Sequence, residues 1–429
     1  MKKFFILIAI FATSWQFLKA QDSDIFWEKN GLEFTYGAAF MSDGNVIAAT
    51  GRTLSKLDVT NGNVIRRFND SLCDIYDYIY RFDISLNTPR VITLNFNSDT
   101  VFIWDYLQEK IIKRISFLIT QPNSIGTVHC VSISPDGKYA LFGVEKESQN
   151  LIVYDIDNNI ELKKLDLYGP PHAVKFSPDG KYFAVGYGHH DDKWQYHDYL
   201  ALFSTQNWEL IKILEQQDEM IENIDFSPDS KLLACGRRIQ PLTVWNVENL
   251  SFVNEYNKNK IGQYTKKAIF TPDSKYILIG SGSPPNNINI LIWDFKFDTL
   301  IYKYPYGSSY CLSPEKDLKY ILIDDGQNIR LLKPKFKYNT VKEETNENIK
   351  FSLFVQKTNI SLNFTNNITA NFIIDLYNIK GVYITNFFSG IIEQGNSTIE
   401  KSLNIPIGTY FLRIKYNKKV ITHKFEIIR

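Results

Sequence analysis

The sequence has no surplus of either charge. Its 429 residues include 48 Lys and Arg against 47 Asp and Glu, which gives a formal net charge of +1. A protein drawn to nucleic acid or to a membrane surface by its overall field carries a clear excess of basic residues, so we expect neither partner. Because 44% of the residues are hydrophobic and only 22% are charged, the composition predicts a folded chain with a large core.

Cysteine is also scarce, with four residues in the chain. Cys130, Cys235 and Cys311 each fall in a separate apolar segment that we interpret as a strand. A disulfide needs Cα atoms within roughly 7 Å of each other, and nothing in the pattern brings these residues so close. We therefore expect buried free thiols rather than bridges.

The common enzyme motifs are missing as well. The sequence contains no phosphate-binding loop of the P-loop or Rossmann type, no Gly-x-Ser-x-Gly, no His-Glu-x-x-His and no Cys-x-x-Cys. A binding function is therefore favoured over catalysis, and no cofactor is expected.

The first twenty residues have the layout of a secretory signal peptide. Lys2 and Lys3 precede an apolar run over residues 4–12, and Ala20 is a small residue at the expected cleavage point. The run is about half of the roughly 20 apolar residues that a membrane-spanning helix needs, so a retained anchor is the less favoured alternative. We predict cleavage after Ala20, no transmembrane anchor, and a mature protein outside the cytoplasm.

Charge is distributed unevenly along the chain. Residues 1–20 contain three basic residues and no acid, and residues 351–429 contain nine bases against four acids. Residues 21–350 therefore carry a net charge of −7, so the large central region is acidic and the tail is basic. Neither region contains a run of like charge long enough to form a polyelectrolyte tail.

A repeat runs through residues 40–332. One copy is Ser-Pro-Asp-Gly-Lys-Tyr-Phe-Ala-Val (177–185), a turn followed by a basic residue and a short apolar segment. Proline fixes φ at the first turn position and Asp bonds its own backbone, so this is a tight turn between two strands. Seven copies occur at spacings of 43 to 50 residues, and the residues that open their apolar segments are Asn45, Arg90, Lys138, Lys181, Lys231, Lys275 and Lys319.

A second apolar segment follows each turn by about twenty residues. In five copies it ends in an aromatic and a polar residue, at Trp104-Asp105, Tyr154-Asp155, Phe203-Ser204, Trp245-Asn246 and Trp293-Asp294. A unit of roughly 45 residues with four short strands is one propeller blade, which must stack on its neighbours in a closed ring. The predicted fold class is all-β, with a seven-bladed β-propeller over residues 21–336.

The Trp-Asp endings and the Ser-Pro-Asp-Gly turns resemble those of WD-repeat propellers and of the related YVTN-type propellers. The resemblance covers about 310 residues and implies a fold rather than a function. The seventh copy shows only three strands, while residues 24–28 precede the first copy without a partner. We predict that residues 24–28 pair across the gap as the fourth strand of the last blade, which removes both open edges.

The tail is predicted to be a separate unit. Residues 337–350 are polar and lack an apolar period, which indicates a linker. Residues 351–429 contain alternating apolar segments separated by turn residues, which predicts a small antiparallel β-sandwich. The predicted strands are 360–364, 371–378, 382–388, 397–405, 409–415 and 420–428.

This tail resembles the type A C-terminal sorting domain of the bacterial type IX secretion system. The matching segments are 374–381, 407–414 and 419–425, and the motif residues are Gly381, Gly408, Thr409, Tyr410, Phe411, Arg413 and Lys424. The resemblance implies that the secretion translocon reads the tail, and that the propeller is secreted or attached to the outer membrane or cell surface of a bacterium, with or without cleavage of the tail. A carbohydrate-binding or adhesion sandwich is the alternative.

One segment concentrates unusual residues. Residues 186–198 hold three of the six histidines and lie in the fourth copy, where a long turn joins the second and third strands. That turn shares a face of the ring with the starts of the first strands, so histidines from two first strands join the candidate set. The candidate ligand-binding residues are His129, His172, His189, His190, Asp191, Asp192, Trp194, His197 and Asp198.

Three interpretations of this segment stay open. Imidazoles and carboxylates bind zinc or another divalent ion, aromatic rings stack on a sugar or a peptide, and a polar loop is also an ordinary hydrated surface. Arg237 and Arg238 occupy the corresponding turn of the fifth copy, where we expect solvated side chains.

The predicted function is a secreted or cell-surface platform that binds an unknown protein or glycan. The alternative is a propeller hydrolase or lyase that uses the His-Asp loop at 187–198, and a purely structural surface component is a third option.

Overall fold

The computed structural model describes the chain in segments. They are residues 25–30, 35–68, 79–95, 100–116, 128–146, 148–190, 196–237, 242–256, 265–283, 286–296, 298–304, 311–316, 318–324, 328–333, 349–356, 359–366, 368–379, 381–403, 405–406, 408–417 and 419–427. Within these segments every regular secondary-structure element is a β-strand, which confirms the all-β class. The chain divides into two compact units, Met1–Pro334 and Lys335–Arg429.

Among the described residues, the first unit contains seven four-stranded antiparallel sheets, numbered here as blades 1 to 7. Blade 1 has β2 (Thr35–Phe40), β3 (Val46–Thr50), β4 (Thr53–Leu57) and β5 (Val64–Phe68). Blade 2 has β6 (Ile79–Ile84), β7 (Arg90–Asn95), β8 (Thr100–Asp105) and β9 (Lys110–Ser116). Blade 3 has β10 (Val128–Ile133), β11 (Tyr139–Val144), β12 (Leu151–Asp155) and β13 (Ile160–Leu165). Blade 4 has β14 (Pro171–Phe176), β15 (Tyr182–His190), β16 (Tyr196–Ser204) and β17 (Leu210–Gln217).

Blade 5 has β18 (Ile221–Phe226), β19 (Leu232–Arg237), β20 (Leu242–Asn246) and β21 (Ser251–Tyr256). Blade 6 has β22 (Thr265–Phe270), β23 (Ile277–Ser283), β24 (Asn286–Asp294) and β25 (Thr299–Tyr304). Blade 7 has β26 (Leu312–Pro314), β27 (Ile321–Asp324), β28 (Ile329–Leu332) and, as its fourth strand, β1 (Ile25–Lys29).

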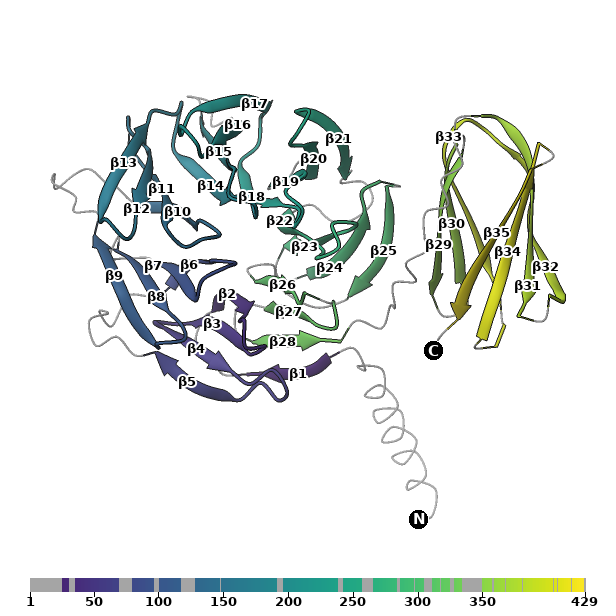
Figure 1. Ribbon diagram of the computed structural model, residues 1–429, viewed down its shortest axis with the longest axis horizontal. Coiled ribbons are helices and arrows are strands. Elements are labelled where there is room, and N and C mark those ends of the chain that lie inside the picture. The colour runs from purple at the N-terminus through teal and green to yellow at the C-terminus, as the bar shows by residue number, and fades with distance from the viewer. Residues whose placement is uncertain are drawn as a thin grey trace, which may run out of the picture. The chain divides into compact units, whose positions relative to one another are not determined.

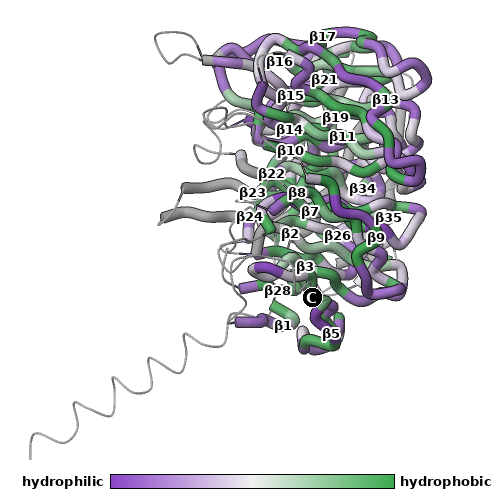
Figure 2. Tube along the Cα trace, turned by 90° about the vertical axis from the view of Figure 1, so that its left-hand side faces the viewer, coloured by the Kyte–Doolittle hydropathy of each residue, from purple (hydrophilic) through white to green (hydrophobic). Residues whose placement is uncertain are grey.

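The seven blades surround a common axis, with the first strand of each blade innermost (Figure 1). Along the tube, hydrophobic residues gather in the inner strands and hydrophilic residues in the outer strands and turns (Figure 2). The outer strands β13, β17 and β21 accordingly expose most of their residues. This gradient is what a twisted sheet produces when only its inner strands are covered on both faces.

The ring is closed by the start of the chain, as predicted. Strand β1 pairs antiparallel with β28, with Trp27 opposite Leu331. The Trp27 side chain is 8% exposed, and its indole nitrogen donates a 2.7 Å hydrogen bond to the carbonyl oxygen of Val59 in blade 1. The same indole lies against Gly62, where any side chain would collide with the ring. One residue of β1 therefore joins the last blade to the first.

The repeated turns have the geometry that their sequence predicts. In blade 4 the Ser177 hydroxyl accepts a 3.0 Å hydrogen bond from the backbone amide of Tyr182, and Asp179 accepts one of 3.1 Å from the amide of Lys181. Blades 3, 5 and 6 repeat both contacts at their own Ser or Thr and Asp. These turns define the turn face of the ring. The hairpins between second and third strands define the opposite face, called the hairpin face.

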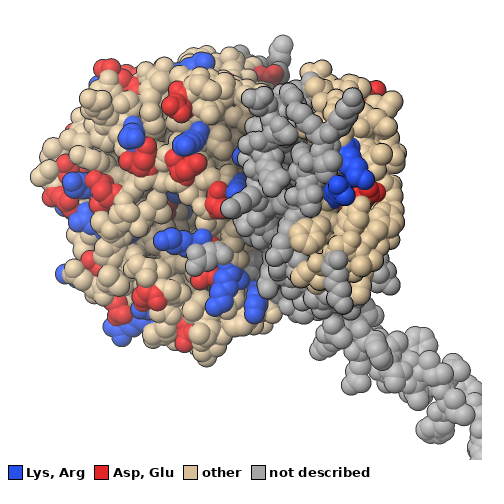
Figure 3. Space-filling view, turned by 45° about the vertical axis from the view of Figure 1, so that its right-hand side comes forward, with Lys and Arg blue, Asp and Glu red and all other residues tan. Residues whose placement is uncertain are grey.

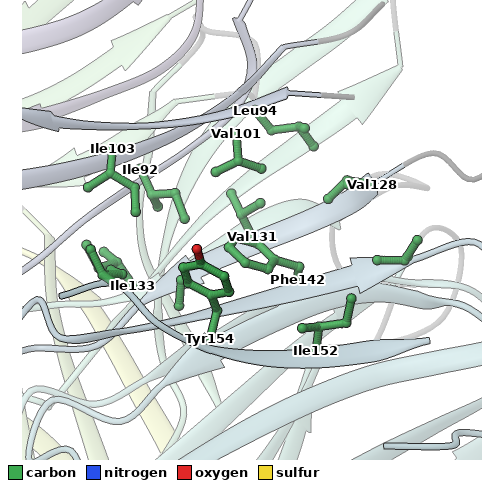
Figure 4. Close-up of a cluster of buried hydrophobic side chains, with 13 residues drawn as sticks. Ile92, Leu94, Val101, Ile103, Val128, Val131, Ile133, Phe142, Ile152 and Tyr154 are labelled. Atoms are coloured by element: carbon green, nitrogen blue, oxygen red, sulfur yellow. The ribbon is translucent and has the colours of Figure 1, made fainter. Parts of the chain in front are cut away.

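The core lies between neighbouring blades. Figure 4 shows the cluster between blades 2 and 3, where Ile92, Val101 and Ile103 face Phe142 and Tyr154. Burying one such side chain contributes about 2 kcal/mol. Because every blade uses both of its faces in this way, the stability of each blade depends on its two neighbours.

Polar groups also link the first strands around the axis. The Asp83 carboxylate of blade 2 accepts hydrogen bonds from the Ser132 hydroxyl at 2.8 Å and the Ile133 amide at 3.1 Å, both in blade 3. It also pairs with the Lys175 ammonium of blade 4 at 2.6 Å. A single carboxylate therefore ties three blades together.

The second unit is a two-sheet antiparallel sandwich, as predicted. One sheet contains β29 (Ile349–Gln356), β30 (Asn359–Asn366) and β33 (Gly395–Ser402). The other contains β32 (Tyr383–Ile392), β31 (Ala370–Asn378), β34 (Gly408–Tyr416) and β35 (Lys419–Ile427). The two sheets bury a shared apolar cluster that includes Leu362, Phe372 and Leu412. Strand β29 is missing from the sequence-based prediction, which placed the first strand at residue 360.

The prediction for cysteine is confirmed at the three described positions. Cys130, Cys235 and Cys311 are free and buried. Burial raises the pKa of the Cys130 thiol to about 12, so this sulfur stays protonated at neutral pH. It acts as a small apolar side chain.

Candidate functional site

A β-bulge lies at the same place in the first strand of each of blades 1 to 6. In every case the pairing register with the second strand shifts by one residue near the hairpin face. The residues inside the bulges are Tyr36, Tyr80, His129, His172, Glu222 and Lys266. Bulges re-aim a side chain and often lie beside functional sites. Two candidate histidines thus owe their position to a bulge, which the sequence pattern did not reveal.

Two candidate residues, His172 and Asp198, approach each other in blade 4, where His172 lies in β14 and Asp198 in β16. The His172 Nε2 atom lies 3.8 Å from the Asp198 Oδ1 atom, and the Asp198 side chain is fully buried. Its Oδ2 atom accepts a 2.8 Å hydrogen bond from the amide of Ile221 in blade 5. The His172 Nε2 and Asp198 Oδ1 atoms are buried without a hydrogen-bond partner.

Burial shifts both groups toward their neutral forms. Burial, followed by the nearby His129, lowers the pKa of His172 to about 4. Burial also raises the pKa of Asp198 to about 6, with Glu219 acting in the same direction against Ile221 and Arg237. The imidazole is therefore uncharged at neutral pH, and the two groups do not form an ion pair.

The long hairpin of blade 4 carries the other candidates. His189 pairs with His197 across β15 and β16, with ring centroids 5.5 Å apart. The Tyr168 ring meets His189 edge-on at 4.5 Å, and His197 Nδ1 lies 3.3 Å from a carboxylate oxygen of Asp218. Because β15 and β16 each have nine residues, the segment is a long strand pair up to His190 rather than a loop.

His129 completes the set from blade 3. Its Nε2 atom lies 2.9 Å from a carboxylate oxygen of Glu145, and its carbonyl oxygen accepts a 3.0 Å hydrogen bond from Arg81. The Arg81 guanidinium in turn lies 4.0 Å from the ring centroid of Tyr80.

The structure therefore brings His129, His172, His189, His197 and Asp198 to one region of the hairpin face, over blades 3 and 4. The side chain of His190 and residues Asp191, Asp192 and Trp194 lie outside the described residues. Among the described residues no group of three or more His, Cys, Asp or Glu side chains is arranged to hold a metal ion. The described residues also contain no helix with the length and apolar character to cross a membrane.

The prediction for Arg237 was wrong. Its side chain is 1% exposed and pairs with the Glu215 carboxylate, which also accepts a 2.8 Å hydrogen bond from Thr243. Glu215 comes from the outer strand of blade 4, so this buried pair ties blade 4 to blade 5. The sequence places Arg237 beside a turn, and nothing in it indicates that Glu215, twenty-two residues earlier, is its partner.

The residues of the predicted sorting motif lie in the second unit. Gly381 has a φ of 76° in the turn between β31 and β32, and Gly408 opens β34. Tyr410 is 5% exposed, and its hydroxyl donates a 2.7 Å hydrogen bond to Pro406. Phe411 is half-buried and Arg413 exposed. Thr409 lies in β34, and Lys424 lies in β35 opposite Phe411, but their side chains lie outside the described residues.

Known structures resemble the first unit. A chain of Kuenenia stuttgartiensis hydrazine synthase matches with a TM-score of 0.59 and 15% identity, covering 72% of this chain and 98% of that one. A chain from the crystal structure of a mitotic checkpoint complex matches with a TM-score of 0.58 and 15% identity, covering 73% of this chain and 92% of that one. The first unit is a seven-bladed β-propeller. At this level of identity the likeness extends to the propeller fold and no further.

Part of the propeller also matches a family model. Residues 123–306 match the family described as eukaryotic translation initiation factor eIF2A. The match covers the repeats that carry the clearest Ser-Pro-Asp turns, from blade 3 to blade 6. No curated protein matches the chain.

Proposed function

We propose that the propeller is a protein-binding platform and that its hairpin face over blades 3 to 5 holds the partner. The observation that carries this proposal is the pair His172 and Asp198, which places two unpartnered polar atoms 3.8 Å apart beneath that face. Buried polar groups without partners cost free energy, so their presence marks a site whose role lies outside folding. The bulge at His172 supports the same location.

The similar proteins are consistent with this role without deciding it. One neighbour belongs to a complex by its printed title, and another is named as an enzyme. Propellers serve both kinds of function, so the fold alone does not choose between them. The choice rests on this chain's own residues.

A capture experiment tests the platform. The exported full chain, tagged and immobilised, is exposed to culture supernatant and cell-envelope fractions, and bound proteins are identified by mass spectrometry. The test variant is Tyr168→Ala, because this exposed ring can be removed without loss of core. The control is Glu248→Gln, an exposed residue in a turn on the turn face. We expect a partner captured by the wild type and the control and lost with Tyr168→Ala; equal capture by all three contradicts the proposed surface.

A hydrolase or lyase is the second candidate, and the approach of His172 to Asp198 favours it. Burial raises the pKa of Asp198 to about 6, closer to neutral pH, as a general acid or base requires, and it lowers the pKa of His172 to about 4, which keeps that imidazole neutral. Alanine at His172, or at His189, His190 and His197 of the His-Asp loop, would abolish turnover under this candidate and leave the capture of partners by the rest of the face largely intact. Elemental analysis of the same sample tests for a bound metal.

We also propose that the chain is exported and sorted. The signal-like residues 1–20 support export, and the motif around Gly408 and Tyr410 supports recognition of the tail by the type IX translocon. The test fuses residues 335–429 behind a signal peptide and a fluorescent protein in a bacterium that has this system. We expect fluorescence at the surface or in the medium, and retention in the periplasm when residues 408–427 are deleted. Periplasmic retention of both fusions contradicts sorting.

A further inference from the structure

Four charged side chains of the first strands lie close together inside the ring. They are Asp83 in β6, Lys175 in β14, Asp225 in β18 and Lys267 in β22, from blades 2, 4, 5 and 6. Asp83 and Lys175 form a 2.6 Å ion pair, although blade 3 lies between their two blades. Because the first strands are innermost around the axis, this contact lies on the inside of the ring (Figure 1).

The Lys267 ammonium group lies in the same region. Burial lowers the pKa of Lys267, and the charge of Lys175 acts in the same direction. Cys311, Asp83 and Asp225 act in the opposite direction. Groups from blades 2, 4, 5 and 7 are therefore near enough to influence this one ammonium group, which places it toward the axis.

Two of the four charges satisfy each other. The Asp83 Oδ1 atom accepts a hydrogen bond from the Lys175 ammonium, and its Oδ2 atom accepts from the Ser132 hydroxyl and the Ile133 amide. Both oxygens of this carboxylate are therefore used, and the pair has a structural role between the blades.

The other two charges lack such partners. The Asp225 Oδ2 atom accepts a 2.9 Å hydrogen bond from the Phe270 amide, but its Oδ1 atom accepts none within the described residues. In the same part of the chain the Lys267 side chain forms neither a hydrogen bond nor an ion pair. Both side chains are half-buried, so solvent reaches them.

Unpaired charges in this position are costly. Burial raises the pKa of Asp225 to about 6, although the charge of Lys175 acts against it. Over the ring surface in Figure 3, acidic and basic side chains are interspersed and face water, where a charge needs no partner. Inside the ring a carboxylate and an ammonium group that stay unpaired lose hydration without a compensating contact. Polar groups left in this way indicate a site for a ligand.

The charges of the four side chains decide the class of that ligand. Two carboxylates and two ammonium groups sum to zero. A lone anion bound at Lys267 meets the repulsion of Asp225, and a lone cation bound at Asp225 meets the repulsion of Lys267. A molecule that carries both charges and no net charge gains an attraction at each end.

We infer that Asp225 and Lys267 hold a small zwitterion inside the ring, with its ammonium group on the Asp225 carboxylate and its carboxylate on the Lys267 ammonium. Amino acids are molecules of this class. Each end forms a charge-assisted hydrogen bond. The inference goes beyond the proposed platform, because the site uses neither His172 nor Asp198 and lies apart from the surface tested with Tyr168→Ala.

Zwitterions of graded length test the inference on the full exported chain. Glycine, β-alanine and γ-aminobutyrate carry the same two charges at increasing separation, and acetate and methylammonium carry one charge each. Ligand-observed NMR titrations near neutral pH measure their dissociation constants. We expect one of the three zwitterions to bind at least about tenfold more tightly than both single-charge controls, the effect of one further charge-assisted hydrogen bond.

Variants locate the binding. Lys267→Met keeps the length of the side chain and removes its charge, and Asp225→Asn keeps an acceptor for the Phe270 amide. Each should weaken the preferred zwitterion by at least about tenfold. Lys275→Met is the matched control, because Lys275 is exposed in the turn between β22 and β23 of the same blade, and it should leave binding unchanged. Thermal melting shows that each variant is folded.

Two results would overturn the inference. If acetate or methylammonium binds as tightly as every zwitterion, the two charges do not act together. If a folded Lys267→Met or Asp225→Asn variant binds the zwitterion as the wild type does, that group is not part of the site. Neither result affects the capture experiment, so the platform is judged separately.

Discussion

Removal of the Trp27 side chain tests the closure of the ring. Trp27 belongs to β1 in blade 7, yet its indole donates to Val59 and packs on Gly62 in blade 1. Replacing a buried aromatic residue with alanine costs about 3–5 kcal/mol, and the lost hydrogen bond adds about 1 kcal/mol. We therefore expect Trp27→Ala to lower the free energy of unfolding by about 5 kcal/mol.

The expected change in melting temperature follows from the size of the propeller. At about 2.1 cal/mol/K per residue, roughly 310 residues have an unfolding entropy of about 0.65 kcal/mol/K, so the loss corresponds to about 8 °C. Calorimetry on the full chain measures it. Phe26→Ala is the matched control, because Phe26 neighbours Trp27 in β1 but is 42% exposed. If the two variants melt within a degree of each other, β1 does not hold the ring and the reasoning is wrong.

Three further changes probe the blade contacts. Asp83→Ala removes the acceptor of the partly exposed Lys175, of the Ser132 hydroxyl and of the Ile133 amide. Urea unfolding should show that the free energy of unfolding falls by about 2–3 kcal/mol. Gly188→Ala places a methyl group 2.2 Å from Asp198 Oδ1, and the same assay should show a loss of about 1–3 kcal/mol; unchanged stability would mean that the hairpin can move apart. Burial raises the pKa of Asp198 from 3.8 to about 6, so the folded chain holds this proton more tightly than the unfolded chain does. The stabilisation from the protonated carboxyl is present at pH 4 and is lost as the pH rises through 6. The free energy of unfolding of Asp198→Asn should therefore rise by up to about 3 kcal/mol relative to that of the wild type between pH 4 and pH 7.5. A difference in unfolding free energy that does not change with pH would contradict the buried carboxylate.

The propeller could be predicted from the sequence because its signals are local. A turn such as Ser177-Pro-Asp-Gly is closed by its own side chains, as the contacts of Ser177 and Asp179 show. The closing strand was also predictable, because a seven-unit ring with an incomplete last unit leaves one apolar segment unpaired. Strand β29 was missed because its residues adjoin a polar segment and were not separated from it by a turn signal.

The site was only partly predictable because its contacts are not local. The histidines of blade 4 were visible as a cluster, and geometry then brought His172 to Asp198. The burial of Arg237 depends on its ion pair with Glu215. Glu215 lies in another blade, and no sequence motif indicates this pairing. The bulges add one residue to the first strand of each of blades 1 to 6, and a one-residue insertion in an apolar run changes neither its composition nor its length enough to be noticed.

The shared last blade has a consequence for the order in which the molecule assembles. Ile25 must find Leu332, about 300 positions later in the chain. Closing a flexible loop of that length costs about 5 kcal/mol in entropy, which is close to what Trp27 contributes. Blades 1 to 6 must therefore stack first and bring the two ends together, so β1 docks late. A ribosome whose exit tunnel still holds residue 332 keeps the ring open, so the ring closes only after that residue has emerged.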